Sequence, residues 1–148
     1  MASDVPSASS GDRVAVSAIR ELVERTPGVA LAVVFGSTAR QATRKPRDLD
    51  IGVLTDPGAE LPALLDVALE RATRRVVDLV HMNTAPPLLR FEIARDGIVI
   101  FERKRYTWAD FRRHVMIDWW DWAPFARRMH GAALVRLRSS GSPVGTEG

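Results

Sequence analysis

The sequence predicts an α/β (α+β) fold: a small mixed β-sheet of about four strands, flanked by helices and followed by a long C-terminal helix. Three observations support this prediction. Short apolar runs alternate with segments whose apolar residues recur every three or four positions. The length, 148 residues, suits one domain. The composition, 46% hydrophobic and 26% charged, is ordinary for a globular protein.

The first half of the chain is expected to form two helices and two strands. Both strands end at turn-forming residues, Gly36 after the first and Asp56-Pro57-Gly58 after the second. In chain order, the elements are a helix carrying Val16, Ile19, Leu22 and Val23, a strand over Val29–Phe35, a strand over Arg47–Leu54, and a helix carrying Leu61, Leu64, Leu65, Val67 and Leu69.

The second half continues the alternation. A β-branched strand over Arg75–Met82 precedes a helix over Ala85–Asp96, with Thr84 as N-cap, prolines in the first turn and Gly97 after the C-cap. An edge-like strand covers Ile98–Phe101. The long helix begins at Thr107, and its main apolar stripe is Trp108, Phe111, Val115, Trp119 and Trp122.

The ends of the chain are expected to be disordered, over residues 1–11 and 139–148, because they are rich in Ser, Gly and Pro. The predicted domain then covers residues 12–138. There is no apolar run of about 18 residues and no signal-peptide pattern, so a cytoplasmic protein without a membrane span is expected. The absence of cysteine excludes disulfides, thiolate catalysis and cysteine zinc sites. The formal charge of +3 is only mildly basic.

Three aspartates interrupt predicted strands and are the first candidate site residues. Asp48 and Asp50 alternate with Leu49 on one strand, so their side chains leave from one face, with Cα atoms roughly 6.6 Å apart. Asp78 interrupts the next strand, where a buried, unpaired carboxylate would be very unfavourable. If the two strands are neighbours, the carboxylates could hold divalent ions, and hard oxygen ligands suit Mg²⁺. Alternatively, Asp48 caps a strand or pairs with Arg47, and the other two bond to basic neighbours.

A second candidate feature lies upstream, directly after the first strand. Gly36-Ser37-Thr38 and a short polar turn would present backbone N–H groups and a hydroxyl at the start of a helix. Such an arrangement favours a phosphate oxyanion, although it is also an ordinary strand-to-helix turn with Ser37 as N-cap. The two features lie within fifteen residues of each other, which strengthens the interpretation of both as binding elements over the purely structural one.

The stretch VVFGSTARQATRKPRDLDIGVL resembles the signature of the DNA polymerase β-like nucleotidyltransferase superfamily. The similarity is closest to the minimal nucleotidyltransferases (MNT), small proteins commonly paired with a HEPN-domain toxin. Their pattern is roughly G-S-x-A-x-G-x-x-x-x-x-S-D-x-D, which Gly36, Ser37, Ala39, Asp48 and Asp50 match in spacing. Two positions depart from it, with glutamine at 41 where glycine is usual and arginine at 47 where serine is usual.

The resemblance implies transfer of AMP from ATP, with two Mg²⁺ ions held by Asp48 and Asp50. Asp78 resembles the third catalytic carboxylate of the family and would complete the first metal site. Gly36 and Ser37 would cradle the β- and γ-phosphates, and Arg40 is a further candidate phosphate contact. The departure at Gln41 removes the conformational freedom of glycine. Arg47 could bind a phosphate or displace a hydroxyl that orients the carboxylates.

The resemblance also implies a protein partner, because a chain of this length has no second domain to hold the acceptor. In this family the partner is a HEPN toxin, an RNase whose tyrosine is AMPylated, so a hetero-oligomer is expected. On the long helix, Met116, Ile117 and Trp120 lie off the main stripe. They would be covered by Pro124-Phe125 or would contact a partner.

Four functions are compatible with these features. The first is a Mg²⁺-dependent protein adenylyltransferase that acts as an antitoxin. The second is an antitoxin that neutralises its partner by binding alone. Antibiotic nucleotidylation is disfavoured because an acceptor domain is missing. Direct nucleic-acid binding would use the basic stretch RKRYTWADFRR, residues 103–113, which could equally be a solvated face or contact an acidic partner.

Overall fold

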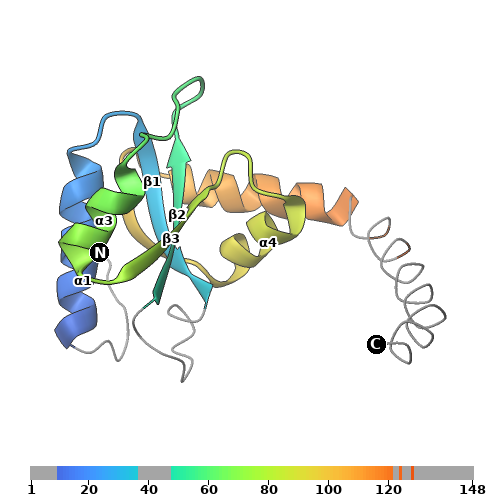
Figure 1. The fold of residues 1–148 in the computed structure, drawn as a ribbon. Helices are drawn as coiled ribbons and strands as arrows, with labels where there is room; N and C mark the ends of the chain where they lie inside the picture. The colour runs from blue at the N-terminus through green and yellow to red at the C-terminus, as the bar shows by residue number, and fades with distance from the viewer. Residues whose placement is uncertain (1–9, 37–47, 122–123, 125–127, 129–148) are drawn as a thin grey trace, which may run out of the picture.

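The computed structural model describes residues 10–36 and 48–121, together with residues 124 and 128 (Figure 1). The first helix, α1 (Ser10–Glu24), begins two residues before the predicted start of the folded core. The rest of the predicted disordered ends, residues 1–9 and 139–148, lies outside the described residues, as does Trp122. Among the described residues, no helix is long and apolar enough to cross a membrane.

A four-stranded mixed sheet forms the centre of the fold, as predicted. Its order is β3-β2-β1-β4, with β1 antiparallel to both β2 and β4, and β2 parallel to β3. The strands are β1 (Val29–Phe35), β2 (Asp48–Thr55), β3 (Val76–His81) and β4 (Ile98–Glu102).

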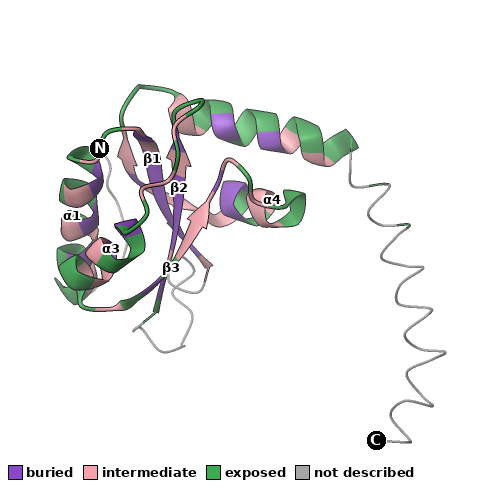
Figure 2. Cartoon of the chain, turned by 45° about the horizontal axis from the view of Figure 1, so that its top comes forward, coloured by how far each residue is buried: buried purple, intermediate pink, exposed green. Residues whose placement is uncertain are grey.

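Helices cover both faces of the sheet (Figures 1 and 2). One face packs against α1 and α3 (Leu65–Thr73), with Ile19, Ile51 and Leu69 completely buried. The other packs against α4 (Pro87–Asp96) and the helix over residues 107–121. Alternate residues of β1 therefore point into two different cores. Because both faces of this strand are buried, its sequence is a continuous apolar run.

The helix over residues 107–121 confirms the predicted main stripe as far as the structure describes it. Phe111 and Val115 are buried, and the half-buried Trp108 and Trp119 stack on neighbouring rings. The centroids of Trp119 and Phe91 on α4 are 4.3 Å apart. The predicted second face divides: Met116 packs on the core, whereas Ile117 and Trp120 are exposed (54% and 76%), and Phe125 lies outside the described residues.

The ends of α4 correct two details of the sequence prediction. The N-cap is Pro86 and not Thr84, because the Thr84 N–H bonds to the His81 carbonyl within a turn. Gly97 is itself the C-cap and has φ −69°. Glycine is needed there for space, since a Cβ atom would lie 2.5 Å from Val33 Cγ1 and 2.6 Å from the Ile93 carbonyl oxygen.

Side chains form hydrogen bonds with backbone groups on both edge strands. Glu70 on α3 accepts a hydrogen bond from the Val77 N–H of β3 at 3.1 Å. Arg20 on α1 donates its Nε–H to the Ile100 carbonyl of β4 at 3.0 Å. Unpaired edge groups are templates for association with other strands, so these two contacts protect the edges.

Two arginines of the basic stretch at residues 103–113 stabilise the ends of helices. Arg103 donates to the carbonyls of Val23, Glu24, Thr26 and Val29, around the C-terminus of α1, at 2.8–3.3 Å. Arg112 donates Nε–H to the Ala94 carbonyl at the end of α4, at 2.9 Å. Helix C-termini carry unsatisfied carbonyls and partial negative charge, which arginine complements. These contacts weaken the nucleic-acid interpretation of the stretch, because both guanidinium groups are already engaged.

We expect Arg103→Met to lower the free energy of unfolding by about 2 kcal/mol, because four carbonyls lose a charged donor. The last turn of α1 contains no basic residue that could replace it. Urea unfolding followed by circular dichroism measures the change. Lys104→Met, which removes a neighbouring exposed charge, is the control and should change stability by less than about 0.5 kcal/mol. Equal stabilities of the two variants would contradict the assigned role of Arg103.

Candidate active site

The three predicted aspartates come together on adjacent strands. Asp48 and Asp50 lie at the start of β2, Asp78 lies on β3, and Asp50 is the direct register partner of Asp78. The two strands are thus neighbours, which was the condition for their carboxylates to share a metal site. Because the strands are parallel and the pair is in register, all three carboxylates leave from the same face.

This face is the one that α4 covers farther along β2. Leu49 and Ile51 point into the core beneath α1 and α3, so the alternate residues Asp48 and Asp50 point to the other side. The next residue on that side, Gly52, lies against Met82 and Ile93. The carboxylates therefore lie beyond this core, at the end of the sheet where β1 ends and β2 and β3 begin.

Gly36 lies directly against this carboxylate group. It follows β1, whose last residue, Phe35, is paired with Asp50. Its φ of +74° is in the left-handed region that favours glycine. A Cβ atom at Gly36 would overlap Asp50 Oδ2 and would lie 3.2 Å from Asp50 Cγ. Only a residue without a side chain lets the backbone approach Asp50 this closely.

The electrostatic environment raises the pKa of Asp50. Burial is the main cause, followed by the negative charges of Asp78 and Asp48 and a hydrogen bond with Asp78. The nearby charges of Asp78 and Asp48 therefore destabilise the charged form of Asp50. This repulsion is what a bound cation would relieve, so the donor chemistry favours a positively charged ligand.

The expectation of a buried Asp78 is wrong. Asp78 is exposed, and its neighbour on the same side of the strand, Val76, is 60% exposed. The reason is that β3 is an edge strand whose first residues extend beyond the α4 core. Asp48 is also exposed, and Asp50 is the half-buried member of the three. The group is therefore accessible from solvent.

The remaining predicted site residues, Ser37 and Arg40, lie outside the described residues, as do Gln41 and Arg47. Of the predicted phosphate-binding turn, the structure places only Gly36. The proposed ligands of a phosphate in this turn therefore stay predictions.

The donor set suits a hard divalent cation such as Mg²⁺, since it consists of carboxylate oxygens. Within residues 10–36 and 48–121, however, no group of three or more His, Asp or Glu side chains is already arranged around one point. The fit therefore rests on carboxylate chemistry and on the register of Asp50 with Asp78. It does not rest on a preformed coordination cage.

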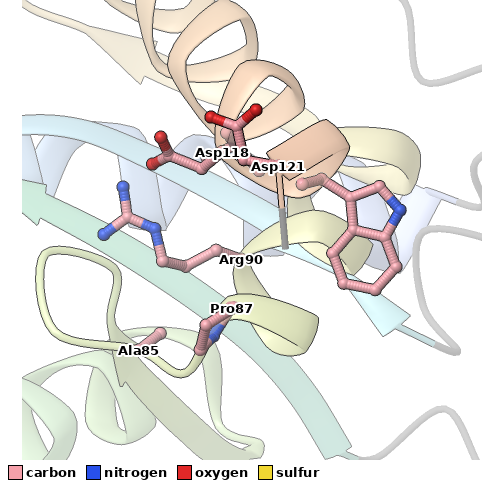
Figure 3. A pocket seen from close by; sticks show the side chains of 7 residues that line it. Ala85, Pro87, Arg90, Asp118 and Asp121 are labelled. Carbon is pink, nitrogen blue, oxygen red and sulfur yellow. The ribbon is translucent and has the colours of Figure 1, made fainter. Parts of the chain in front are cut away.

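A pocket of about 420 Å³ lies between α4 and the end of the helix over residues 107–121 (Figure 3). Asp118 and Asp121 lie on one wall, and Arg90 lies opposite (Figure 3). None of the predicted site residues lines it. Arg90 Nη1 donates to the carbonyls of Met82 and Asn83 at 3.1 Å each, so this arginine also holds the turn between β3 and α4. No sequence pattern distinguishes Arg90 from a surface arginine.

Another polar group that the sequence analysis did not identify joins the opposite ends of β2 and β3. The Thr55 hydroxyl donates to the Ala59 carbonyl and lies 3.0 Å from His81 Nε2. The Asn83 side chain accepts from the Thr55 N–H and donates to its carbonyl. Thr55 is buried, so these bonds satisfy groups that would otherwise be costly. The network fixes the alignment of the two strands that carry the aspartates.

Comparison with known proteins agrees with this geometry. The sequence profile described as "Polymerase beta, Nucleotidyltransferase" matches residues 17–106, which include Gly36 and all three aspartates. No curated protein matches the chain. One solved structure, described as a minimal nucleotidyltransferase, is 35% identical, with 58% of this chain and 89% of that chain covered and a TM-score of 0.50.

Two further solved structures share the fold over most of both chains. One is a chain in the structure of a complex between the tri-AMPylated HEPN toxin of Shewanella oneidensis and an MNT antitoxin (19% identity, 82% and 98% coverage, TM-score 0.67). The other is from a toxin–antitoxin structure with AMP-PNP (18% identity, 81% and 96% coverage, TM-score 0.66). The family profile covers more than half of the sequence and contains the carboxylate group, and the chain therefore belongs to the polymerase β nucleotidyltransferase family.

Proposed function

We propose that the protein is a Mg²⁺-dependent nucleotidyltransferase that transfers AMP from ATP to a side chain of a HEPN-domain toxin, and that it acts as the antitoxin of that toxin. The observation that carries the proposal is the register of Asp50 with Asp78, beside Asp48 and against Gly36. This arrangement supports the proposal, because it brings carboxylates of two strands together beside a close-packed glycine. It also leaves them open to solvent for a second substrate.

The proposed roles follow from position. Asp48, Asp50 and Asp78 would hold Mg²⁺, most simply as two ions, and the bound metal would neutralise the phosphate oxygens and stabilise both the entering and the leaving oxygen. The raised pKa of Asp50 reflects the negative charge that the metal would offset. Asp78, exposed on an edge strand, would accept the proton of the attacking hydroxyl at its carboxylate, while the hydroxyl oxygen bonds to the α-phosphorus of ATP and pyrophosphate leaves. Gly36 would bring backbone close to the nucleotide phosphates, with Ser37 and Arg40 as further proposed contacts.

A protein acceptor is supported by two features. First, Asp78 is exposed on an edge strand, so a hydroxyl on another protein can approach it from outside the sheet. Second, chains with the same fold occur in structures with AMP-PNP and with a tri-AMPylated HEPN toxin. We expect the acceptor to be tyrosine, by similarity to the family.

The test combines the purified protein, ATP, MgCl₂ and a HEPN-domain toxin as the candidate partner. We expect the toxin to gain the mass of AMP, only when Mg²⁺ is present. The double variant Asp48→Ala, Asp50→Ala should add no AMP and should fail to protect cells that express the toxin. If the double variant still protects fully, AMP transfer is not how the protein neutralises its partner.

A second candidate function is neutralisation of the toxin by binding alone. The observation that favours it is the lack, among the described residues, of side chains already arranged around a metal. Under this alternative the wild-type protein binds and inhibits the toxin without ATP. Inhibition of toxin RNase activity in a nucleotide-free assay, with no added mass on the toxin, would favour this alternative over transfer.

A further inference from the structure

The helix over residues 107–121 presents an apolar stripe on the side away from the sheet. Its inner side is buried through Phe111 and Val115. On the outer side, Ile117 and Trp120 are three positions apart and share one face. Arg113, four residues before Ile117, continues this face. We call Arg113, Ile117 and Trp120 the outer stripe. A tryptophan that is 76% exposed beside an exposed isoleucine marks an interaction surface.

Charge is distributed unevenly along this helix. The exposed basic residues Arg112 and Arg113 come in its first half, where Asp110 is the exposed acid, and the exposed acids Asp118 and Asp121 come in its second half. Arg113 pairs with Asp110 at 3.1 Å, but both side chains are more than 60% exposed, so this pair is worth little and can rearrange. If two identical helices pack antiparallel, the acidic half of each lies beside the basic half of the other.

We propose that two copies of this chain associate through the outer stripe, with their helices antiparallel about a two-fold axis beside Ile117. Each Ile117 then packs against Ile117 of the second copy. Arg113 of each copy lies opposite Trp120 and Asp121 of the other. The guanidinium group stacks on the indole ring and pairs with the carboxylate. The contact is self-complementary, as a two-fold interface requires.

The expected dimer is weak. One stripe of one helix buries less than the roughly 800 Å² per partner of a standard stable interface, so association should depend on protein concentration. The proposal is independent of the proposed function, because the carboxylates of β2 and β3 take no part in the contact. A variant that loses AMP transfer should still form the dimer, and a variant that loses the dimer should still transfer AMP.

The absence of cysteine from the chain allows a direct test. In the variant Ile117→Cys, the two introduced thiols would face each other across the axis, and a short bis-maleimide should link them into a dimer. Leu64→Cys, at a residue that is 71% exposed near the start of α3, is the control and should be linked far more slowly. Equal linking of the two variants would overturn the proposal.

Sedimentation equilibrium of the full chain gives a second test. Trp120→Ala should raise the dissociation constant of the dimer about 10-fold or more, as expected for a central tryptophan. Arg113→Glu and Asp121→Arg should each weaken the dimer, and the two changes together should restore it. The proposal is overturned if the wild type is monomeric at all concentrations, or if the combined variant associates no better than either single one. Circular dichroism checks that each variant folds.

Discussion

Asp50→Asn should reduce AMP transfer by about 10³-fold, and it should also make the folded protein more stable at neutral pH. The loss of activity follows because Asp50 is the central carboxylate, in register with Asp78 and closest to Gly36. Removing its charge weakens binding of the metal. The bound metal would supply several kcal/mol of transition-state stabilisation, so the rate falls. Measurement of added AMP mass on the partner protein under single-turnover conditions gives the rate.

The gain in stability follows from the pKa of Asp50, which burial and the charges of Asp78 and Asp48 raise in the folded state. The folded state therefore favours the protonated group, and the stability from this preference is fully present below the pKa of the unfolded chain. It is lost as pH rises through the raised pKa of the folded state. Asparagine resembles the protonated form and can still bond to Asp78.

The variant should thus be more stable than the wild type at neutral pH, and the difference should disappear at acid pH. Thermal unfolding at the two pH values measures this, with Asp56→Asn, an exposed turn residue, as the control. Mg²⁺ should stabilise the wild type more than the Asp50→Asn variant, because a ligand that binds only the folded state raises its stability. Equal effects of Mg²⁺ on the two proteins would argue against a metal at Asp50.

The sequence was sufficient to predict the features that depend on local pattern. Alternation of Asp48, Leu49 and Asp50 predicts both the strand and the side on which the acids lie, and the structure confirms the strand and its buried Leu49. Spacing of apolar residues likewise predicts the helices, although Leu61 and Leu64 precede α3, which begins at Leu65. These features follow from periodicity, which a single sequence contains.

Features that depend on tertiary contacts were not predictable in this way. The C-terminus of α1 needs Arg103, which lies 80 residues after Val23, and no local pattern relates the two. The sequence pattern accounts for Gly97 only as the end of a helix, whereas its constraint in the structure is the close approach of Val33 on another element. The exposure of Asp78 depends on the place of β3 at the edge of the sheet, which the sequence did not specify.

Gly36→Ala should reduce AMP transfer by about 100-fold or more, although the protein remains folded. Two effects combine at this position. The φ of +74° makes any L-residue unfavourable, by about 1 kcal/mol or somewhat more. In addition, the new Cβ atom would overlap Asp50 Oδ2, so that the carboxylate must move away from its place beside Asp78. A displacement of about 1 Å in a catalytic group can itself cost a factor of 100.

Gly58→Ala separates these two effects. Gly58 has φ +81°, nearly the same as Gly36, but a Cβ atom there would have no heavy atom within 4 Å. It lies in the turn after β2, at the opposite end of that strand from Asp48 and Asp50. Both variants should therefore lose similar stability in urea unfolding, and only Gly36→Ala should lose transfer. If both retain transfer, the close approach of Gly36 to Asp50 is not required for the reaction. If only Gly36→Ala loses it, the loss comes from the position of the carboxylate, because backbone strain is matched in the control.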